Sequence, residues 1–258
     1  MKMNFHANEN AESYTGREAD DTWARTMLSV VDPRGKRVVD IGCGGGIYSK
    51  AWAKLGAASV TGVDFSSAML KTAQKQCADE PRISFVQGDA LQTGLPDASA
   101  DIVFARALIH HLEDLNGFFA EGKRLLAPGG ICIIQDRTID DCAVPASKTH
   151  LRGYFFEQFP RLLAVEAKRR PEDRTVQAAM QQAGLADIRL LSLWEVRRVY
   201  GNLAELADDL RSRKGRSLLH ELADEELEQL VDTICQKFSG QETISEQDRW
   251  SIWIGRHV

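Results

Sequence analysis

The sequence predicts an α/β fold built on a mostly parallel β-sheet. Short β-branched runs alternate with helix-length amphipathic segments between residues 37 and 135, a rhythm typical of parallel strands joined by right-handed helical crossovers. A glycine-rich turn joins the first of these runs to the first helical segment. The chain has 258 residues, of which 43% are hydrophobic and 27% charged, and this composition excludes collagen-like, coiled-coil and wholly disordered proteins.

The first half of the chain supplies the alternating elements. Residues 1–32 are expected to form a loose N-terminal arm followed by one amphipathic helix. Five strands are expected next, at 37–41, 59–63, 83–86, 102–105 and 131–135. Amphipathic helices follow the first, second and fourth strands, and Ser66 is the expected N-cap of the second of these helices. Together these elements predict a Rossmann-like, doubly wound sheet.

Beyond Asp136 the alternation stops. The remaining elements are expected to be an aromatic helical stretch at 151–165, a helix around 176–183, a strand within 188–200, a helix at 203–222, a helix around 227–234 and a closing strand at 250–255. No segment has the composition of a linker, so we expect one domain over 1–258. The helical insertions at 139–170 and 202–240 are interpreted as a cap over the substrate.

Net charge, apolar stretches and cysteine spacing limit the ligands and the compartment that we expect for this protein. The net charge is -5, whereas nucleic-acid binders usually carry a basic excess, so a small-molecule partner is favoured. Apolar stretches are too short for a membrane span and residues 1–14 are too polar for a secretory signal, so we expect a cytoplasmic protein without membrane association. Five cysteines with no CxxC spacing predict reduced thiols and no metal site.

The glycine-rich turn has the spacing G-x-G-x-G over residues 42–46. Glycines at this position let backbone N–H groups approach a ligand with no Cβ in the way. A dinucleotide site would need a third glycine where Ile47 stands. Asp64 ends the second strand, and its carboxylate can accept hydrogen bonds from both hydroxyls of a ribose. Asp89 follows the third strand, and its carboxylate can accept a hydrogen bond from the amino group of an adenine. These residues outline an adenosine pocket.

With these motifs the sequence resembles the class I S-adenosylmethionine-dependent methyltransferases, specifically the type 11 small-molecule group. The resemblance covers residues 36–137 closely. It rests on five motifs in register, namely Asp40-Ile41-Gly42-x-Gly44-x-Gly46, Val63-Asp64-Phe65-Ser66, Gly88-Asp89-Ala90, Ile109-His110-His111-Leu112 and Leu126-x-Pro128-Gly129-Gly130.

The resemblance implies S-adenosylmethionine as cofactor, S-adenosylhomocysteine as product and a seven-stranded sheet with an antiparallel C-terminal hairpin. By position it implies that Gly42 and Gly44 line the methionine moiety, Asp64 holds the ribose, Phe65 and Met69 flank the adenine, Asp89 and the Ala90 amide read the adenine edge, and Ala105 and Arg106 lie beside the sulfonium. Asp40 is the nearest carboxylate to the sulfonium. The segment between the last two strands is longer than is usual in the family.

Candidates for catalysis follow the fourth and fifth strands. His111, with slight preference, and His110 are candidate general bases, because imidazole titrates near neutrality; packing of the loop is the alternative role. Asp136 either orients the substrate or caps the next turn. Tyr14 in the arm is a candidate to close over the cofactor.

Two features of the insertions have alternative interpretations. The aromatic residues Tyr154, Phe155, Phe156 and Phe159 form either a lid over an apolar acceptor or ordinary core. The basic runs 168–170 and 211–216 are either solvated, locally paired helix faces or a surface for an acidic substrate or partner.

The function expected from the whole sequence is in-line transfer of a methyl group from S-adenosylmethionine to a small-molecule acceptor. An NAD-dependent oxidoreductase is the first alternative, disfavoured by Ile47 and by Asp89. An RNA methyltransferase is the second, although no Asn-Pro-Pro, Asp-Pro-Pro or Pro-Cys motif is present. A non-catalytic S-adenosylmethionine-binding protein is the third.

Overall fold

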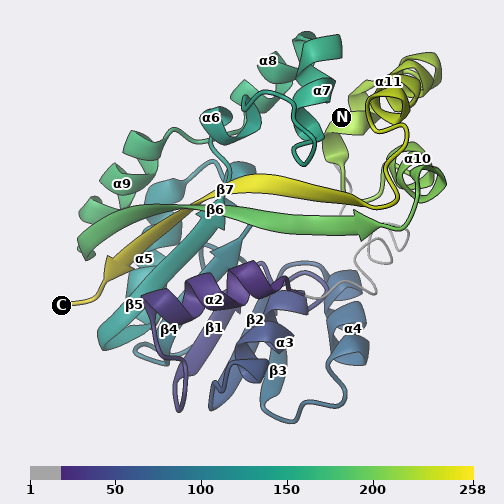
Figure 1. The fold of residues 1–258 in the computed structure, drawn as a ribbon. Coiled ribbons are helices and arrows are strands. Elements are labelled where there is room, and N and C mark those ends of the chain that lie inside the picture. The colour runs from purple at the N-terminus through teal and green to yellow at the C-terminus, as the bar shows by residue number, and fades with distance from the viewer. Residues whose placement is uncertain (1–18) are drawn as a thin grey trace. The chain divides into compact units, whose positions relative to one another are not determined.

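The computed structural model describes residues 19–258. The expected arm at 1–16, including Tyr14, therefore lies outside the described residues. The chain forms two compact units. The first unit comprises the residues up to Asp136 together with Pro171–Leu193 and Ser251–Val258, and the second comprises Arg137–Arg170 and Trp194–Trp250 (Figure 1).

Seven strands form one sheet in the order β3-β2-β1-β4-β5-β7-β6. Their bounds are β1 Arg37–Ile41, β2 Ser59–Asp64, β3 Ile83–Gln87, β4 Ala100–Arg106, β5 Leu126–Asp136, β6 Ala186–Tyr200 and β7 Ile244–Arg256. Neighbouring strands among β1 to β5 pair in parallel, whereas β7 runs antiparallel to β5, with Asp136 opposite Ser251. The predicted α/β class with an antiparallel C-terminal part is confirmed.

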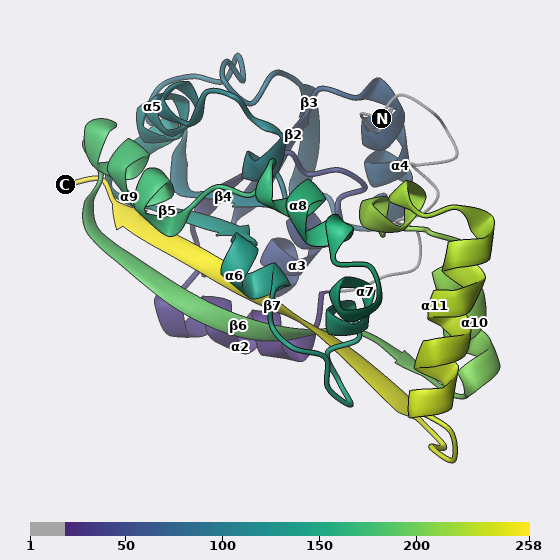
Figure 2. The same ribbon diagram turned by 90° about the horizontal axis from the view of Figure 1, so that it is seen from above.

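Helices cover both faces of the sheet in the first unit. They are α2 Asp21–Val30, α3 Ile47–Lys54, α4 Ser67–Gln76, α5 Leu115–Leu125 and α9 Asp173–Gln182, with a 3₁₀ turn η1 at Ile109–His111. Figure 2 shows α5 and α9 on one side of β4 and β5 and α2 on the other. On the α2 side, Trp23, Trp52 and Phe104 meet edge to face, with ring centroids 5.3–5.8 Å apart. Buried aromatic and aliphatic surface of this kind holds the strands whose ends build the site.

The second unit is mainly helical. Its elements are α6 Ile139–Cys142, α7 Arg152–Gln158, α8 Arg161–Ala167, α10 Leu203–Arg211, a 3₁₀ turn η2 at Ser217–Glu221, and α11 Asp224–Lys237. Figures 1 and 2 show α10 and α11 side by side. Phe155 is buried in the core of this unit, and Tyr154, Phe156 and Phe159 pack against that core. These contacts support the core interpretation of the aromatic residues.

Three expected elements of the second half have different bounds. The single helix expected at 203–222 is wrong, because the chain leaves the helical conformation at Arg213 (φ 54°) and Gly215 (φ 64°). Pro160 separates α7 from α8 within the expected aromatic helix, since it lacks the N–H that a helix interior needs. The last strand starts at Ile244 rather than 250, because buried Glu246 and Asp248 have ion-pair partners.

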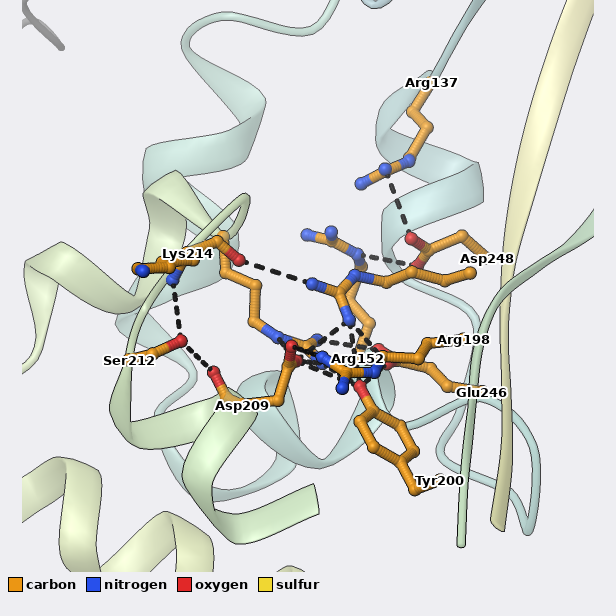
Figure 3. A network of polar contacts seen from close by, with 11 residues as sticks. Arg137, Arg152, Arg198, Tyr200, Asp209, Ser212, Lys214, Glu246 and Asp248 are labelled. Carbon is orange, nitrogen blue, oxygen red and sulfur yellow. Dashed lines mark hydrogen bonds and ion pairs between the residues drawn. The ribbon is translucent and has the colours of Figure 1, made fainter. Parts of the chain in front are cut away.

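The arginines of the second basic run pair locally. Arg211 pairs with Glu228 (2.8 Å) and Arg213 pairs with Asp224 (2.9 Å), both at exposed positions of α11. Exposed pairs of this kind contribute little to stability. They support the interpretation of a solvated, locally paired face for these two arginines. For Arg216 that interpretation is wrong, because its side chain is buried and pairs with Asp209 and Glu246 (Figure 3).

Gly153 in α7 provides a stability prediction for the second unit. A Cβ at this position would lie against the backbone of Ala146, and 2.7 Å from the carbonyl carbon of Pro145. Since main-chain atoms cannot rotate away, we expect Gly153→Ala to lower the free energy of unfolding by about 1–3 kcal/mol or more. Thermal unfolding measures this, with Gly240→Ala in the same unit as comparison, because Gly240 has a positive φ but open space around it. Equal losses in the two variants would contradict the steric argument.

Candidate functional site

The glycine loop turns from β1 into α3 through a backbone that only glycine adopts readily. Gly42, Gly44 and Gly46 have φ values of 71°, 53° and 83°. The amides of Gly42 and Cys43 both donate to the carbonyl oxygen of Val63, at 2.7 and 3.0 Å. Gly46 is the N-cap of α3 and has no side chain to cap it. The first amides of this helix are therefore oriented as an anion- or carbonyl-binding end.

Asp64 fastens this loop to the end of β2. Its Oδ2 accepts from the amide of Gly44 and its Oδ1 from the amide of Ser66, both at 2.9 Å. A carboxylate has about four lone-pair sites, so one carboxylate can accept from several donors at once, including hydroxyls. The sequence suggested a ligand contact for Asp64; its second role, as an acceptor that holds two loops together, was not foreseen.

The residues expected around an adenine lie on the neighbouring loops. Met69 in α4 is buried, and its Cε lies 3.5 Å from where a Cβ on Gly44 would be. Phe65 is 46% exposed. The amide of Gly88 donates to the carbonyl oxygen of Asp64 at 3.1 Å, and this bond brings the loop of exposed Asp89 to the end of β2. The next residue, Ala90, packs against the core of the first unit.

Ala105 and Arg106 end β4, beside β1. Ala105 is paired in register with Ile41 and is fully buried. The guanidinium of Arg106 lies 4.4 Å from the ring centroid of Tyr48, a cation–π contact. Tyr48 lies in α3, and no sequence signal connects it with Arg106.

Asp40 is a buried carboxylate below the glycine loop. Its Oδ2 accepts from the hydroxyl of Ser49 at 2.6 Å. Burial raises the pKa of Asp40 to about 7, and the charge of Asp64 adds to this rise; Ser49 and Arg106 oppose it. Asp40 is therefore a site at which proton binding and the binding of a cation are coupled near neutral pH. Sequence analysis did not single out Ser49.

Cys43 lies inside the glycine loop and is buried. Burial, together with the charges of Asp40 and Asp64, raises the pKa of its thiol well above the usual range. The thiol is therefore protonated and chemically quiet in the folded protein.

His110 is held by the buried carboxylate of Asp136. Its Nδ1 lies 2.9 Å from both carboxylate oxygens, and its backbone amide donates to Oδ2 at 3.2 Å. The His110 side chain is 8% exposed and that of Asp136 is fully buried. Because a carboxylate accepts, Nδ1 is the protonated nitrogen, and Nε2 is the one that can take up a proton.

The neighbouring candidates take different positions. His111 is exposed, with its ring centroid 3.9 Å from that of His110. Thr138 is the N-cap of α6 and forms a capping box with Asp141, so Asp136 does not cap that helix. The contact that Asp136 makes in the structure is with the ring of His110, which is neither of the two roles expected for it.

Within residues 19–258 no group of three or more His, Cys, Asp or Glu side chains could hold a metal ion. No helix in the described part of the chain is long and apolar enough to cross a membrane.

Comparison with known proteins finds similarity to methyltransferases within the first unit. Residues 39–134 match the family model Methyltransf_11, described as a methyltransferase domain. The chain is similar to the ubiquinone biosynthesis O-methyltransferase of Psychrobacter arcticus, with 36% identity over 105 residues, covering 39% of this chain and 40% of that protein. It is also similar to the malonyl-[acyl-carrier protein] O-methyltransferase of Serratia marcescens, with 36% identity over 100 residues, covering 38% and 37%.

A solved structure with a similar fold is that of phosphoethanolamine N-methyltransferase 2 from Haemonchus contortus in complex with phosphomonomethylethanolamine and S-adenosylhomocysteine. The TM-score is 0.63 at 18% sequence identity, covering 98% of this chain and 60% of that chain. At this identity the likeness shows the fold alone. The chain matches 40% and 37% of the length of the two O-methyltransferases named above.

Proposed function

We propose that this protein transfers the methyl group of S-adenosylmethionine to a small-molecule acceptor and releases S-adenosylhomocysteine, because residues 39–134 match the model of a methyltransferase domain. The observation that carries the proposal is the contact between Asp64 and Gly44 at the carboxyl ends of β1 and β2. It sets a charged acceptor at the end of β2 against the glycine loop, whose left-handed backbone has no Cβ between the main chain and a ligand. A ribose and an amino-acid moiety attached to it require this combination.

The first unit would hold each part of the cofactor with a different residue. We propose that Gly42 and Gly44 line the methionine moiety, Asp64 binds the ribose, and Phe65 and Met69 flank the adenine. The adenine edge is assigned to Asp89 with the amide of Ala90, and the surroundings of the sulfonium to Asp40, Ala105 and Arg106. Methyl transfer is an in-line displacement, so positioning of the acceptor against the methyl carbon supplies roughly 7–11 kcal/mol of the barrier reduction.

We propose that His110, held by Asp136, takes the proton that the methylated group of the substrate gives up. A hydroxyl or protonated amine loses a proton when it is methylated, and Nε2 of His110 can take that proton. Asp136 is a positioning residue, since its contact with Nδ1 fixes the tautomer and orients the ring. His110 is preferred to His111 because the Asp136 contact holds the ring of His110 in one orientation.

We further propose that the second unit determines which acceptor is methylated, with the insertions at 139–170 and 202–240 acting as a cap. The segment that matches the family model lies entirely in the first unit. Relatives that share such a segment are named for different acceptors. The second unit lies outside the segment that matches the family model, so its residues can differ with the acceptor.

The test of the proposed function first compares the binding of two cofactors and then measures turnover with candidate acceptors. Titration calorimetry is expected to show binding of S-adenosylmethionine and none of NADH. A panel of phenols, carboxylic acids and amines is then assayed for release of S-adenosylhomocysteine. Binding of NADH in preference to S-adenosylmethionine would favour an oxidoreductase. Cofactor binding without turnover on any acceptor, in a protein that exchanges cofactor freely, would favour a non-catalytic binding protein.

The raised pKa of Asp40 predicts a pH dependence of cofactor binding. The bound sulfonium and ammonium charges favour the carboxylate form, so binding releases a proton wherever Asp40 is protonated in the free protein. Affinity should therefore rise as the pH increases toward 7, the value near which the pKa of Asp40 lies, by up to about tenfold per pH unit, and level off above it. Calorimetry from about pH 5.5 to 7.5 measures the slope of cofactor affinity against pH, and Asp40→Asn should reduce this slope. A slope unchanged in the variant would assign the proton to another group.

We also propose that the protein works in a reducing compartment, the cytoplasm. Its five cysteines are all free thiols, and four of them are buried. Chains that fold in oxidising compartments usually use their cysteines in disulfides.

A further inference from the structure

Ser49 is a buried serine in the first turn of α3, and its hydroxyl donates to Asp40. Oγ lies 2.6 Å from Oδ2 of Asp40, and the two residues are 0% and 2% exposed. A backbone hydrogen bond from Ser49 acts on the same carboxylate. Because Gly46, the N-cap of α3, has no side chain, Asp40 takes the place of a capping group for this helix. Burial raises the pKa of Asp40, and the hydroxyl of Ser49 is the strongest of the influences that oppose this rise.

Asp40 lies near the carboxyl end of β1, two residues before Gly42, where the glycine loop starts. In the register of β1 with β4 it is opposite Phe104, one position before the pair formed by Ile41 and Ala105. Ala105 is one of the residues assigned above to the surroundings of the sulfonium. The Asp40 carboxylate therefore belongs to the end of the sheet at which positive charge on the cofactor is expected.

Charged groups of opposite sign act on Asp40 from the two neighbouring strands. Asp64 at the end of β2 disfavours a second negative charge, whereas Arg106 at the end of β4 favours it. The thiols of Cys43 and Cys77 also interact electrostatically with Asp40. Burial raises the pKa of both thiols, to about 11 for Cys77, so they stay neutral near pH 7. With one charge of each sign beside Asp40, a single hydrogen bond can change which of its forms predominates near neutrality.

The cofactor and the product of the proposed reaction differ at the sulfur by one methyl group and one positive charge. The ammonium and carboxylate groups of the amino-acid moiety are the same in both molecules. A charged carboxylate near the sulfur therefore favours S-adenosylmethionine over S-adenosylhomocysteine, whereas a neutral carboxyl group provides no such preference. The charge state of Asp40 thus affects how strongly the product competes with the cofactor.

We propose that Ser49 is a positioning residue that keeps Asp40 in its charged form, and that this pair sets the preference of the protein for the sulfonium cofactor over its neutral product. This inference rests on the proposed methyl transfer and adds to it a control of product inhibition. Binding of the sulfonium and loss of the Asp40 proton support each other, because each favours the charged carboxylate. Ser49 has no contact with the ligand in this proposal and acts through Asp40.

The experiment measures the ratio of two dissociation constants, that of S-adenosylhomocysteine over that of S-adenosylmethionine, by titration calorimetry between about pH 5.5 and 8.5. Effects of the shared ammonium group cancel in this ratio. The proteins are the wild type, Ser49→Ala, Ser49→Cys, Asp40→Asn and the control Ser29→Ala. Ser29 is an exposed serine of α2 in the same unit, and its hydroxyl donates to the carbonyl oxygen of Thr26 at 2.7 Å. The control therefore removes a hydrogen-bonded hydroxyl that does not contact Asp40.

In the wild type and the control, the preference for S-adenosylmethionine should rise by about tenfold as Asp40 loses its proton with increasing pH, and then level off. Ser49→Ala should move this rise to higher pH by about one pH unit, because the charged carboxylate loses a hydrogen bond. At pH 7 its preference for the cofactor should therefore fall several-fold. Ser49→Cys should give a smaller displacement, since a thiol is a weaker donor. Asp40→Asn should show a low preference that does not change with pH.

An unchanged curve in Ser49→Ala overturns the proposal, as does a wild-type ratio that stays constant with pH while both ligands bind. If Ser49 served only the fold, Ser49→Ala would lower Tm and weaken both ligands equally without displacing the curve, and this result also overturns it. Should Ser49→Ala fail to fold, Ser49→Cys provides the displacement, and an undisplaced curve there has the same meaning. Failure of the wild type to bind either ligand would contradict the proposed function instead, so the two failures are distinguishable.

Discussion

Replacing Asp64 with alanine is expected to weaken the binding of S-adenosylmethionine by about 2–4 kcal/mol, because the ribose hydroxyls lose a charged acceptor in a largely buried position. The structure adds a second cost, since the amides of Gly44 and Ser66 lose their acceptor and the glycine loop is released from β2. Asp64→Asn separates the two effects, as it keeps one acceptor oxygen. Titration calorimetry measures the affinity, and thermal unfolding measures the loop contribution.

Asp79→Ala is the matched control for this experiment. Asp79 is an exposed carboxylate of the first unit that pairs with Lys50 at 2.7 Å. Its removal changes the net charge equally without touching the loop, so affinity should stay at the wild-type value. If Asp64→Ala also binds S-adenosylmethionine as tightly as the wild type, the ribose assignment is wrong.

Changing His110 to glutamine is expected to lower the rate of methyl transfer by about 10²–10⁴-fold, the usual contribution of a positioned general base. The effect requires an acceptor that loses a proton on methylation. Asp136→Asn should lower the rate as well, because an amide no longer fixes the tautomer of His110. Cofactor affinity should remain unchanged in both variants. Release of S-adenosylhomocysteine at saturating cofactor measures the rate.

His111→Gln is the matched control, because it removes the adjacent imidazole at an exposed position. Its rate should stay within a small factor of the wild type. A large loss in His111→Gln with normal turnover in the His110 variant would assign the base to the other ring. Normal turnover in all three variants would leave the histidines with a packing role only.

Much of the first unit could be predicted from the sequence because its signals are local. The strand at 37–41, the Ser66 cap and the glycine loop depend on β-branched runs, one capping side chain and residues without a Cβ. Each of these acts over a few positions along the chain. The sequence also placed Asp64 and Asp89 at the ends of β2 and β3, and the structure finds them there.

Features that depend on distant partners could not be predicted. The contact between His110 and Asp136 joins residues 26 positions apart and depends on the β4–β5 register, in which Arg106 lies opposite Gln135. The polar start of β7 gives no strand signal, since burial of Glu246 and Asp248 is stable only beside arginines from other elements. Composition likewise says nothing about which arginines of a basic run become buried.

The burial of Cys43 within the glycine loop supplies an intrinsic reporter of loop opening. A protonated, enclosed thiol cannot be alkylated until the segment around it opens, so the labelling rate follows the population of the open form. Cys132, enclosed in strand β5, reports the unfolding of the sheet on the same sample. A saturating ligand that binds the glycine loop should slow the alkylation of Cys43. The alkylation rate of Cys132 should depend only on the global stability of the protein. Mass spectrometry of the unaltered protein could therefore follow ligand occupancy without any engineered probe.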